Sequence, residues 1–469
     1  MKFKNMPKGI KASIIFFLAS LVTKGIAYIT TPLYTRMLSV SQYGQVSLYM
    51  TWVQIFGIIA MFCLSYGVFN NGMLDYPDKR DEYTFSILIL SNIITIIFMG
   101  IIFCIYPLVE KIIGLSRPFI ILMGVMFVFQ PAYSLWYTRQ RYEYKYKWVA
   151  IWSIIIAILS PIVAIIAMFN VKLLDQRIYA RIFGGEITLI LIYIGFYLYL
   201  AIKNKFRVET KYWKSAIVFN LPLIPHYLST YLLGSSDRIM IANIVGDSAT
   251  AFYSIAYSVA SVATIVWAAV NASLVPYTYE KCRKKDYKSI SKVTLPIVTL
   301  FAIACVMVIM LAPEIVAIMA TSQYKEAIYV IPPIVGGVFF QVLYFVFTNV
   351  VYYYKKTKYV MIASTISVIL NITLNIVFIP KYGYMAAGYT TLVSYLVQAF
   401  IDYIAMKKII KVDIYNMKYI GFLSILIIII SIISGFIYNN LLIRLLIILL
   451  IVCITFIKRS KIISIIKNL

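Results

Sequence analysis

Charged residues are scarce in this sequence. Only 13% of its 469 residues are Asp, Glu, Lys or Arg, whereas 62% are hydrophobic, and the charged share is about half that of an ordinary soluble protein. Histidine occurs once, and the five cysteines have no C-x-x-C spacing. No loop between apolar segments is longer than about twenty residues. These scarcities exclude a large soluble catalytic domain, a disulfide framework and a cysteine-based metal site, so we expect no metal centre and no enzyme.

Apolar runs are abundant instead. Mean hydropathy is +0.89, and runs of about 20 residues, enough to cross ~30 Å of hydrocarbon, recur along the whole chain. We predict an all-α integral membrane protein with about 14 transmembrane helices, at 12–33, 45–66, 85–106, 117–137, 148–169, 177–201, 213–233, 249–273, 292–312, 328–352, 359–378, 383–404, 418–437 and 441–457.

The basic residues behind the net charge of +26 are distributed according to the predicted topology. If the N-terminus is cytoplasmic, 32 of the 43 Lys and Arg residues lie in cytoplasmic segments and 8 in outer ones, while Lys24, Arg181 and Arg444 lie inside apolar segments. This asymmetry is the positive-inside rule. It predicts a multi-pass protein of a cytoplasmic membrane with both termini cytoplasmic, and it gives no reason to expect nucleic acid as a partner.

Two weak internal sequence similarities suggest a repeat of six helices. Gln130–Tyr133 resembles Gln341–Tyr344, 211 positions later, and Thr35–Leu38 resembles Asp237–Met240, 202 positions later. Transporters often consist of such repeats. We therefore predict an N-lobe (1–201), a linker (202–212), a C-lobe (213–405), and two further helices with a basic tail (406–469). The two pseudo-symmetric lobes would surround a central cavity.

Lys24 lies near the middle of the first apolar run. A charge at that depth costs roughly 2.5–3.5 kcal/mol on insertion scales, so it usually faces a polar cavity or a partner. Lysine binds phosphate as a compact point charge, which makes Lys24 our first candidate for binding an anion. Snorkelling to the interface and pairing with a carboxylate are the structural alternatives. The 202-residue offset matches Lys24 with His226, the only histidine, which could bind phosphate, titrate, or form a neutral packing contact.

Other polar groups in apolar segments extend this list. Arg36, Asp237 and Arg238 lie near outer helix ends, where they could anchor the helices, close a gate as an inter-lobe ion pair, or touch substrate. Arg181 and Glu186 are five residues apart. Arg181 could line the cavity and bind substrate, Glu186 could belong to the gate with Asp237 and Arg238, and either residue could pair with other helices. Four amides also lie inside apolar segments, where they could bind a polar cargo or, more commonly, join helices: Gln54, Gln130, Asn271 and Gln341.

Four stretches carry a family resemblance: Pro32–Gly44, Leu221–Pro225 followed by Asp237-Arg238, Ala251–Ser254, and Leu374–Gly383 followed by Ala387-Gly388. In this order they resemble the polysaccharide-unit flippases of the multidrug/oligosaccharidyl-lipid/polysaccharide exporter superfamily. The resemblance implies alternating-access translocation of undecaprenyl-pyrophosphate-linked oligosaccharides from the inner to the outer leaflet of a bacterial cytoplasmic membrane. It also implies a role in making O-antigen, capsule or exopolysaccharide. With such a cargo, the four amides could form hydrogen bonds with sugar hydroxyls.

That resemblance leaves several points open. We expect membrane lipids and the polysaccharide polymerase or chain-length machinery as partners. We expect no cofactor, although transport could be coupled to H⁺ or Na⁺. A cation-coupled multidrug antiporter is the first alternative, although buried carboxylates would be expected in its early helices and the first two segments contain none. A membrane-embedded polymerase or glycosyltransferase is the second alternative, and it would need a large outer loop with acid/base residues.

Overall fold

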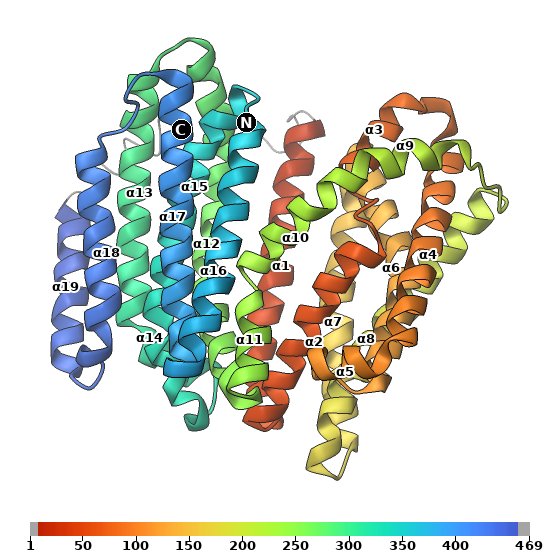
Figure 1. Ribbon diagram of the computed structural model, residues 1–469, viewed down its shortest axis with the longest axis horizontal. Helices are drawn as coiled ribbons and strands as arrows, with labels where there is room; N and C mark the ends of the chain where they lie inside the picture. The colour runs from red at the N-terminus through yellow and green to blue at the C-terminus, as the bar shows by residue number, and fades with distance from the viewer. Residues whose placement is uncertain (1–7, 458–469) are drawn as a thin grey trace. The chain divides into compact units, whose positions relative to one another are not determined.

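Apolar segments become helices in a membrane because helices satisfy their own backbone hydrogen bonds. The computed structural model, which describes residues 8–457, is all-helical over that range, without a strand (Figure 1). It divides into two compact units, Met1–Tyr231 and Leu232–Leu469. The basic tail predicted beyond residue 457 lies outside the described residues.

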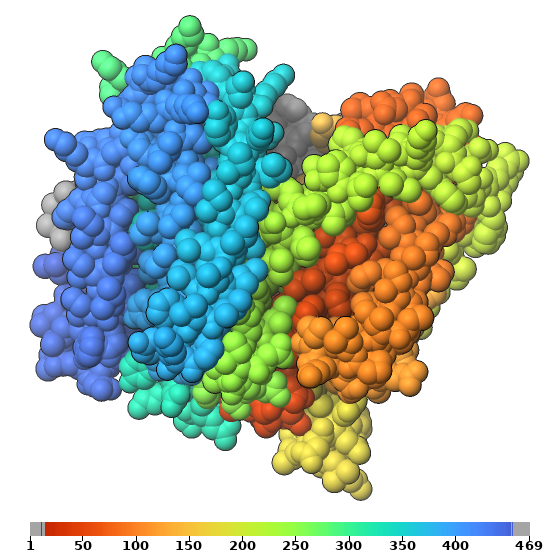
Figure 2. Space-filling model, viewed as in Figure 1, coloured from red at the N-terminus to blue at the C-terminus, as the bar shows by residue number. Residues whose placement is uncertain are grey.

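The N-terminal unit contains ten α-helices: α1 (Lys8–Met37), α2 (Val40–Ala60), α3 (Gly67–Asp75), α4 (Arg80–Cys104), α5 (Tyr106–Ile113), α6 (Arg117–Tyr142), α7 (Tyr146–Asn170), α8 (Arg177–Lys203), α9 (Lys211–Asn220) and most of α10 (Ile224–Leu233). Helix α8 packs against α6 and α7, and α1 packs along α7. Helix α9 lies over α3 and α4, as the space-filling view also shows (Figure 2).

The C-terminal unit contains the remaining helices: α11 (Ser236–Ile244), α12 (Asp247–Arg283), α13 (Tyr287–Met310), α14 (Ala312–Met319), α15 (Ile331–Tyr353), α16 (Thr357–Tyr382), α17 (Tyr384–Ile410), α18 (Met417–Ile437) and α19 (Leu441–Ile457). Helix α15 is its centre, because it is mostly buried and packs against α12, α13, α17 and α18.

Eleven of the described helices are long and apolar enough to cross a membrane. This confirms the all-helical membrane fold but not the count of fourteen. Helices form at the other three predicted spans as α2, α17 and α19, but these do not qualify. Polar residues along α2 and α17 lower their hydropathy, and α19 has only 17 residues.

The boundary between the compact units falls after Tyr231, inside α10. By their contacts, the predicted linker and the first part of the predicted seventh span belong to the N-terminal unit. The predicted division into two six-helix repeats stays a prediction.

Candidate functional site

Helix α1 carries two of the predicted substrate-binding cations. The Lys24 side chain is exposed, and no described carboxylate lies within ion-pair distance of its amine. Arg36 is also exposed, but its guanidinium donates a 2.8 Å hydrogen bond to the Pro32 carbonyl of the same helix. A cation at the end of a helix is favourable there. Lys24 is therefore available to an anion, whereas Arg36 caps its own helix.

His226 lies in an interrupted helix. The 3₁₀ turn Leu221–Leu223 separates α9 from α10, and Pro222 and Pro225 remove the backbone donors that would continue a regular helix. His226 is half-buried, and its ring centroid lies 5.9 Å from that of Tyr227. By its contacts it belongs to the same compact unit as Lys24.

A polar cavity lies inside the N-terminal unit, where α2 breaks. Helix α2 ends at Ala60, and Phe62 and Cys63 adopt left-handed backbone conformations before α3 begins. Such conformations cost of order 1–3 kcal/mol each for residues other than glycine, and they persist only where the surroundings hold them. The carbonyls freed by the break accept hydrogen bonds from side chains of α4 and α9: Thr95 to Ala60 (3.0 Å), Ser91 to Met61 (3.4 Å) and Asn220 to Phe62 (2.7 Å).

This cavity brings together two of the predicted sugar-binding amides. It has a volume of about 110 Å³, and its polar lining consists of Gln54, Ser65, Tyr66, Ser91, Gln130 and Ser134. The Gln130 carbonyl oxygen is buried and accepts no hydrogen bond from a described residue. Amides and hydroxyls both donate and accept, so the cavity can hold several water molecules or a hydroxyl-bearing group.

Arg181 and Glu186 approach a second group of buried polar side chains in the same unit. The Arg181 guanidinium lies 4.0 Å from the Tyr34 ring centroid, a cation–π contact. Glu186 is 4% exposed, and its Oε2, like the Tyr49 hydroxyl, has no hydrogen-bond partner among the described residues. Arg181 and Glu186 form no ion pair with each other within 4 Å in that part of the chain. Glu186 is therefore buried inside the unit, and the predicted role of both residues in lining a central cavity stays a prediction.

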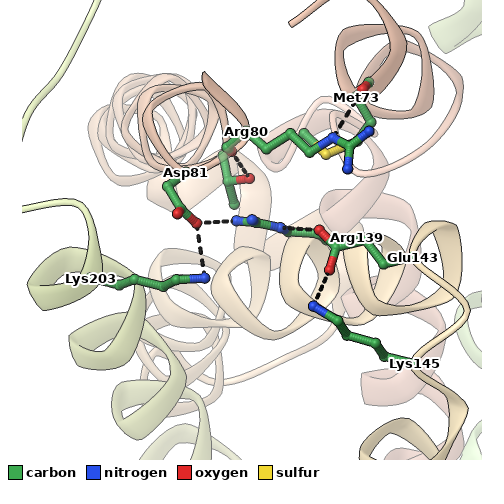
Figure 3. A network of polar contacts seen from close by, with 8 residues as sticks. Met73, Arg80, Asp81, Arg139, Glu143, Lys145 and Lys203 are labelled. Carbon is green, nitrogen blue, oxygen red and sulfur yellow. Dashed lines mark hydrogen bonds and ion pairs between the residues drawn. The ribbon is translucent and has the colours of Figure 1, made fainter. Parts of the chain in front are cut away.

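A charged network, drawn in Figure 3, joins residues in segments that the charge distribution predicts to be cytoplasmic. Arg139 of α6 bonds to Asp81 of α4 and, at 3.0 Å, to Glu143. Lys203 of α8 pairs with Asp81 at 3.0 Å, and Lys145 pairs with Glu143. The network therefore joins α4, α6 and α8. We did not predict it, because the sequence does not reveal which acid meets which base.

The same network affects the titration of Glu143. Burial alone would raise the pKa of this carboxyl, but hydrogen bonds from Lys145 and Arg139 outweigh burial and lower it below the ordinary value. Beside the network, an open cavity of about 510 Å³ is lined by Trp136, Trp148, Trp152, Tyr199, Lys145 and Lys203, among others. Aromatic and basic side chains together are typical of a membrane interface.

The C-terminal unit holds Asp237 in a buried polar cluster. Asp237 is fully buried and accepts hydrogen bonds from Asn375 (2.6 Å), Thr391 (2.6 Å) and Tyr253. Its neighbour Arg238 instead lies 4.5 Å from the Tyr257 ring centroid. These contacts lie within one unit, so the predicted inter-lobe gate involving Asp237, Arg238 and Glu186 stays a prediction.

The other two predicted sugar-binding amides join helices in this unit. Asn349 donates a 2.8 Å hydrogen bond to Asn271, which links α15 to α12. Gln341 donates to the Tyr395 hydroxyl at 3.2 Å, which links α15 to α17. Among the described residues, no three His, Cys, Asp or Glu side chains gather closely enough to hold a metal ion.

Comparison of the chain with known proteins identifies its family. The sequence model of the family described as "Polysaccharide biosynthesis protein" matches residues 10–282, and the MatE model matches residues 222–377. A protein of Haemophilus influenzae called "Lsg locus putative protein 1" is 23% identical over 78% of this chain and 90% of its own length. An uncharacterized membrane protein of the same organism is 21% identical over 81% of this chain and 94% of its own length.

Solved structures share the fold. The lipid II flippase MurJ, in an inward closed conformation, superposes with a TM-score of 0.70 at 17% identity, covering 96% of this chain and all of that one. An inward-facing multidrug transporter of the MATE family gives 0.61 at 11% identity, covering 84% of this chain and 94% of that one. The chain therefore belongs to the polysaccharide biosynthesis protein family, within the multidrug/oligosaccharidyl-lipid/polysaccharide exporter superfamily of membrane transporters and flippases.

Proposed function

We propose that this protein moves undecaprenyl-pyrophosphate-linked oligosaccharides from the inner to the outer leaflet of a bacterial cytoplasmic membrane, with both termini cytoplasmic. The translocated oligosaccharide would be used to synthesise O-antigen, capsule or exopolysaccharide. The polymerase and chain-length machinery, which would use it, would be the partners of this protein. Membership of the polysaccharide biosynthesis family supports the class of cargo.

The observation that carries this proposal is Lys24. It is an exposed cation within a candidate membrane span, and no described carboxylate neutralises it. Such a charge is stabilised by an anion, and a lipid pyrophosphate is an anion that must cross the bilayer. In the N-terminal unit, the cavity lined by Gln54 and Gln130 supplies amides and hydroxyls suited to a glycan.

Coupling to H⁺ or Na⁺ is part of the proposal. The Asp237 cluster supports it, because this buried carboxylate is held by neutral amide and hydroxyl donors, and a bound H⁺ or Na⁺ would compensate its charge.

The multidrug antiporter remains a second candidate because the MatE model matches residues 222–377. A binding site for cationic drugs needs accessible carboxylates, whereas the first acidic residue of the chain is Asp75, beyond α1 and α2. The basic residue Lys24 favours an anionic cargo.

The experiment uses a strain in which the gene is deleted and the lipid-linked oligosaccharide is assayed in each leaflet. Without the protein, we expect the intermediate to accumulate in the cytoplasmic leaflet, and the wild-type gene should restore its appearance outside. Lys24→Arg should restore export in part, because the charge remains. Unchanged leaflet distribution in the deletion strain, with loss of dye efflux instead, would identify a drug transporter.

A further inference from the structure

A second carboxylate, Asp402, is buried in the C-terminal unit without a hydrogen bond. It lies on α17 and is fully buried, and neither of its carboxylate oxygens accepts a hydrogen bond from any residue the structure describes. Within the same described part of the chain, no lysine or arginine lies within ion-pair distance of it. The nearby Lys407 pairs with Asp413 instead, at 3.0 Å. An ionised carboxylate in such surroundings is strongly disfavoured.

The neighbours of Asp402 are neutral. Gln398, one turn earlier on α17, is 3% exposed, and its side-chain carbonyl oxygen also accepts no hydrogen bond from a described residue. Tyr344 and Tyr352 of α15 interact electrostatically with Asp402. Helix α17 packs against α15 and α16 (Figure 1), so this group of acceptors lies between helices and not towards lipid.

The charge of the buried Asp402 carboxylate needs either a proton or a cation to compensate it. A metal ion such as Na⁺ or Ca²⁺ takes about six oxygen ligands, and no metal-binding group of acidic, His or Cys side chains occurs among the described residues. A proton needs only one of the two carboxylate oxygens, and the resulting hydroxyl becomes a donor for a neighbour such as Gln398. The observed surroundings therefore fit a carboxylic acid better than a metal site.

A series of tyrosines connects this site to the other buried acid of the unit. Asp237 accepts from the Tyr253 hydroxyl, and the Tyr253 and Tyr257 ring centroids lie 6.2 Å apart. Tyr257 and Tyr344 both interact with Tyr395, and Tyr344 with Asp402. By the predicted topology, Asp237 lies near the outer end of its segment and Asp402 near the cytoplasmic end. Phenol hydroxyls donate and accept, so they can relay protons.

We propose that Asp402 is a proton-binding site of the C-terminal unit, linked by these tyrosines to Asp237. The step is simple protonation: one carboxylate oxygen gains a proton and later releases it, and no other bond changes. The use of this proton to drive transport rests on the proposed function, whereas proton binding itself does not.

Other ionisable groups around Asp402 do not confuse a titration. The ionisable groups that interact electrostatically with Asp402 are the phenols Tyr344 and Tyr352 on α15. On α12, Tyr279 interacts with Tyr352 and Tyr257 with Tyr395. On α16, the Tyr359 ring centroid lies 5.9 Å from the Lys408 amine. Phenols and lysines ordinarily titrate near pH 10. Between pH 5 and 9, a change in this region therefore reports a carboxyl group.

Infrared spectroscopy of the purified full-length protein in lipid nanodiscs tests proton binding directly. We expect a carbonyl band of a protonated carboxyl at pH 7 that shifts in D₂O, shifts again in protein labelled with [4-¹³C]aspartate, and is missing in Asp402→Asn. The labelled wild type needs no variant to fold, and Asp402→Glu, in which the band should lose its aspartate-label shift, is a further check. Absence of any protonated aspartate band at pH 7 would overturn the proposal, as would a band that responds to Na⁺ but not to pH.

Coupling is tested separately in vesicles with an imposed pH gradient. We expect the gradient to stimulate lipid-linked oligosaccharide transport by the wild type, and Asp402→Asn to lose this stimulation. If the infrared band is present but the vesicles transport no such lipid, the proposed function fails while proton binding stands. Stimulation that survives in Asp402→Asn would overturn the coupling role of this residue.

Discussion

At the scale of single residues, Lys24 differs from the other cations in the apolar segments. Arg444 of α19 is 6% exposed and donates two 2.7 Å hydrogen bonds to Glu314, and Arg181 lies over the Tyr34 ring. Both are therefore compensated within their own units. Lys24 has no described carboxylate in ion-pair distance, which is the physical reason to assign it an external anion.

Glu143 should contribute measurably to stability. Replacement by Gln leaves the buried Arg139 and neighbouring Lys145 without their shared carboxylate, and hydrogen bonds to charged groups contribute about 1.5–3 kcal/mol. We expect Glu143→Gln to lower the free energy of unfolding by about 1–2 kcal/mol, measured by thermal or chemical unfolding in detergent. Glu280→Gln is the control, because that carboxylate is exposed and pairs with Lys284, which directly follows its own helix α12. Equal effects of both changes would refute the role of the network.

The contribution of Glu143 should depend on pH in a defined direction. Because the pKa of Glu143 is lowered in the folded state, its stabilisation is fully present above the ordinary glutamate pKa, about 4.3, and is lost as pH falls through the lowered value. The difference between wild type and Glu143→Gln should therefore be constant from about pH 6 to 7 and shrink below about pH 4. A difference that grows on acidification would contradict this assignment.

Sequence reasoning at this scale identified residue types but not pairings. The charge census singled out Lys24, Arg181 and Arg444 as cations inside apolar segments. It could not show that Arg444 meets Glu314, or that Asp402 accepts no hydrogen bond from a described residue, because both depend on contacts between helices far apart in the chain. Isolated acids were visible in the sequence, but their complete burial was not.

At the scale of elements, the break between α2 and α3 distinguishes the N-terminal unit. Non-helical backbone at membrane depth is tolerated only where protein or a water-filled cavity surrounds it. Here α4 and α9 supply side-chain donors to the freed carbonyls, and the polar cavity adjoins the break. The helices themselves were predicted from hydropathy. The break was not, because residues 61–66 contain neither proline nor glycine and the donors that stabilise the break come from other helices.

Close packing of α3 against α4 gives a matched test of this arrangement. A Cβ at Gly72 would lie 2.1 Å from the Tyr83 ring, which is itself confined by Phe69 and Tyr212. We expect Gly72→Ala to destabilise the protein by about 1–3 kcal/mol through overpacking. Gly100→Ala, in the same α4 helix as Tyr83 and with no atom within 4 Å of the added carbon, should be neutral or stabilise by up to about 1 kcal/mol. Thermal unfolding of both variants and the wild type measures the two effects. A Gly72→Ala variant as stable as the wild type would show that α3 packs differently.

At the scale of the whole molecule, membership of the polysaccharide biosynthesis family and the MurJ-like fold place this chain among membrane transporters. The resemblance in four short stretches was enough to predict that family, and the family match confirms it. The predicted count of fourteen spans is not confirmed in the same way, because the polar residues of α2 and α17 lower the hydropathy of these helices below that of a typical span. Neither the fold nor the helix count identifies the cargo. The proposal of an anionic cargo depends on the positive charge of Lys24 in α1.

The most direct test of lipid-linked oligosaccharide transport is a leaflet assay with the purified full-length protein in vesicles containing an undecaprenyl-pyrophosphate-linked oligosaccharide. Access of an added glycosidase to the glycan would report its movement between leaflets. We predict transport by the wild type and by Lys172→Ala, a control in the exposed loop after α7. Lys24→Ala should be at least about 10-fold slower, since a charge-assisted hydrogen bond contributes about 1.5–3 kcal/mol. Transport by Lys24→Ala at the wild-type rate, or no movement of this lipid by the wild type, would contradict the account.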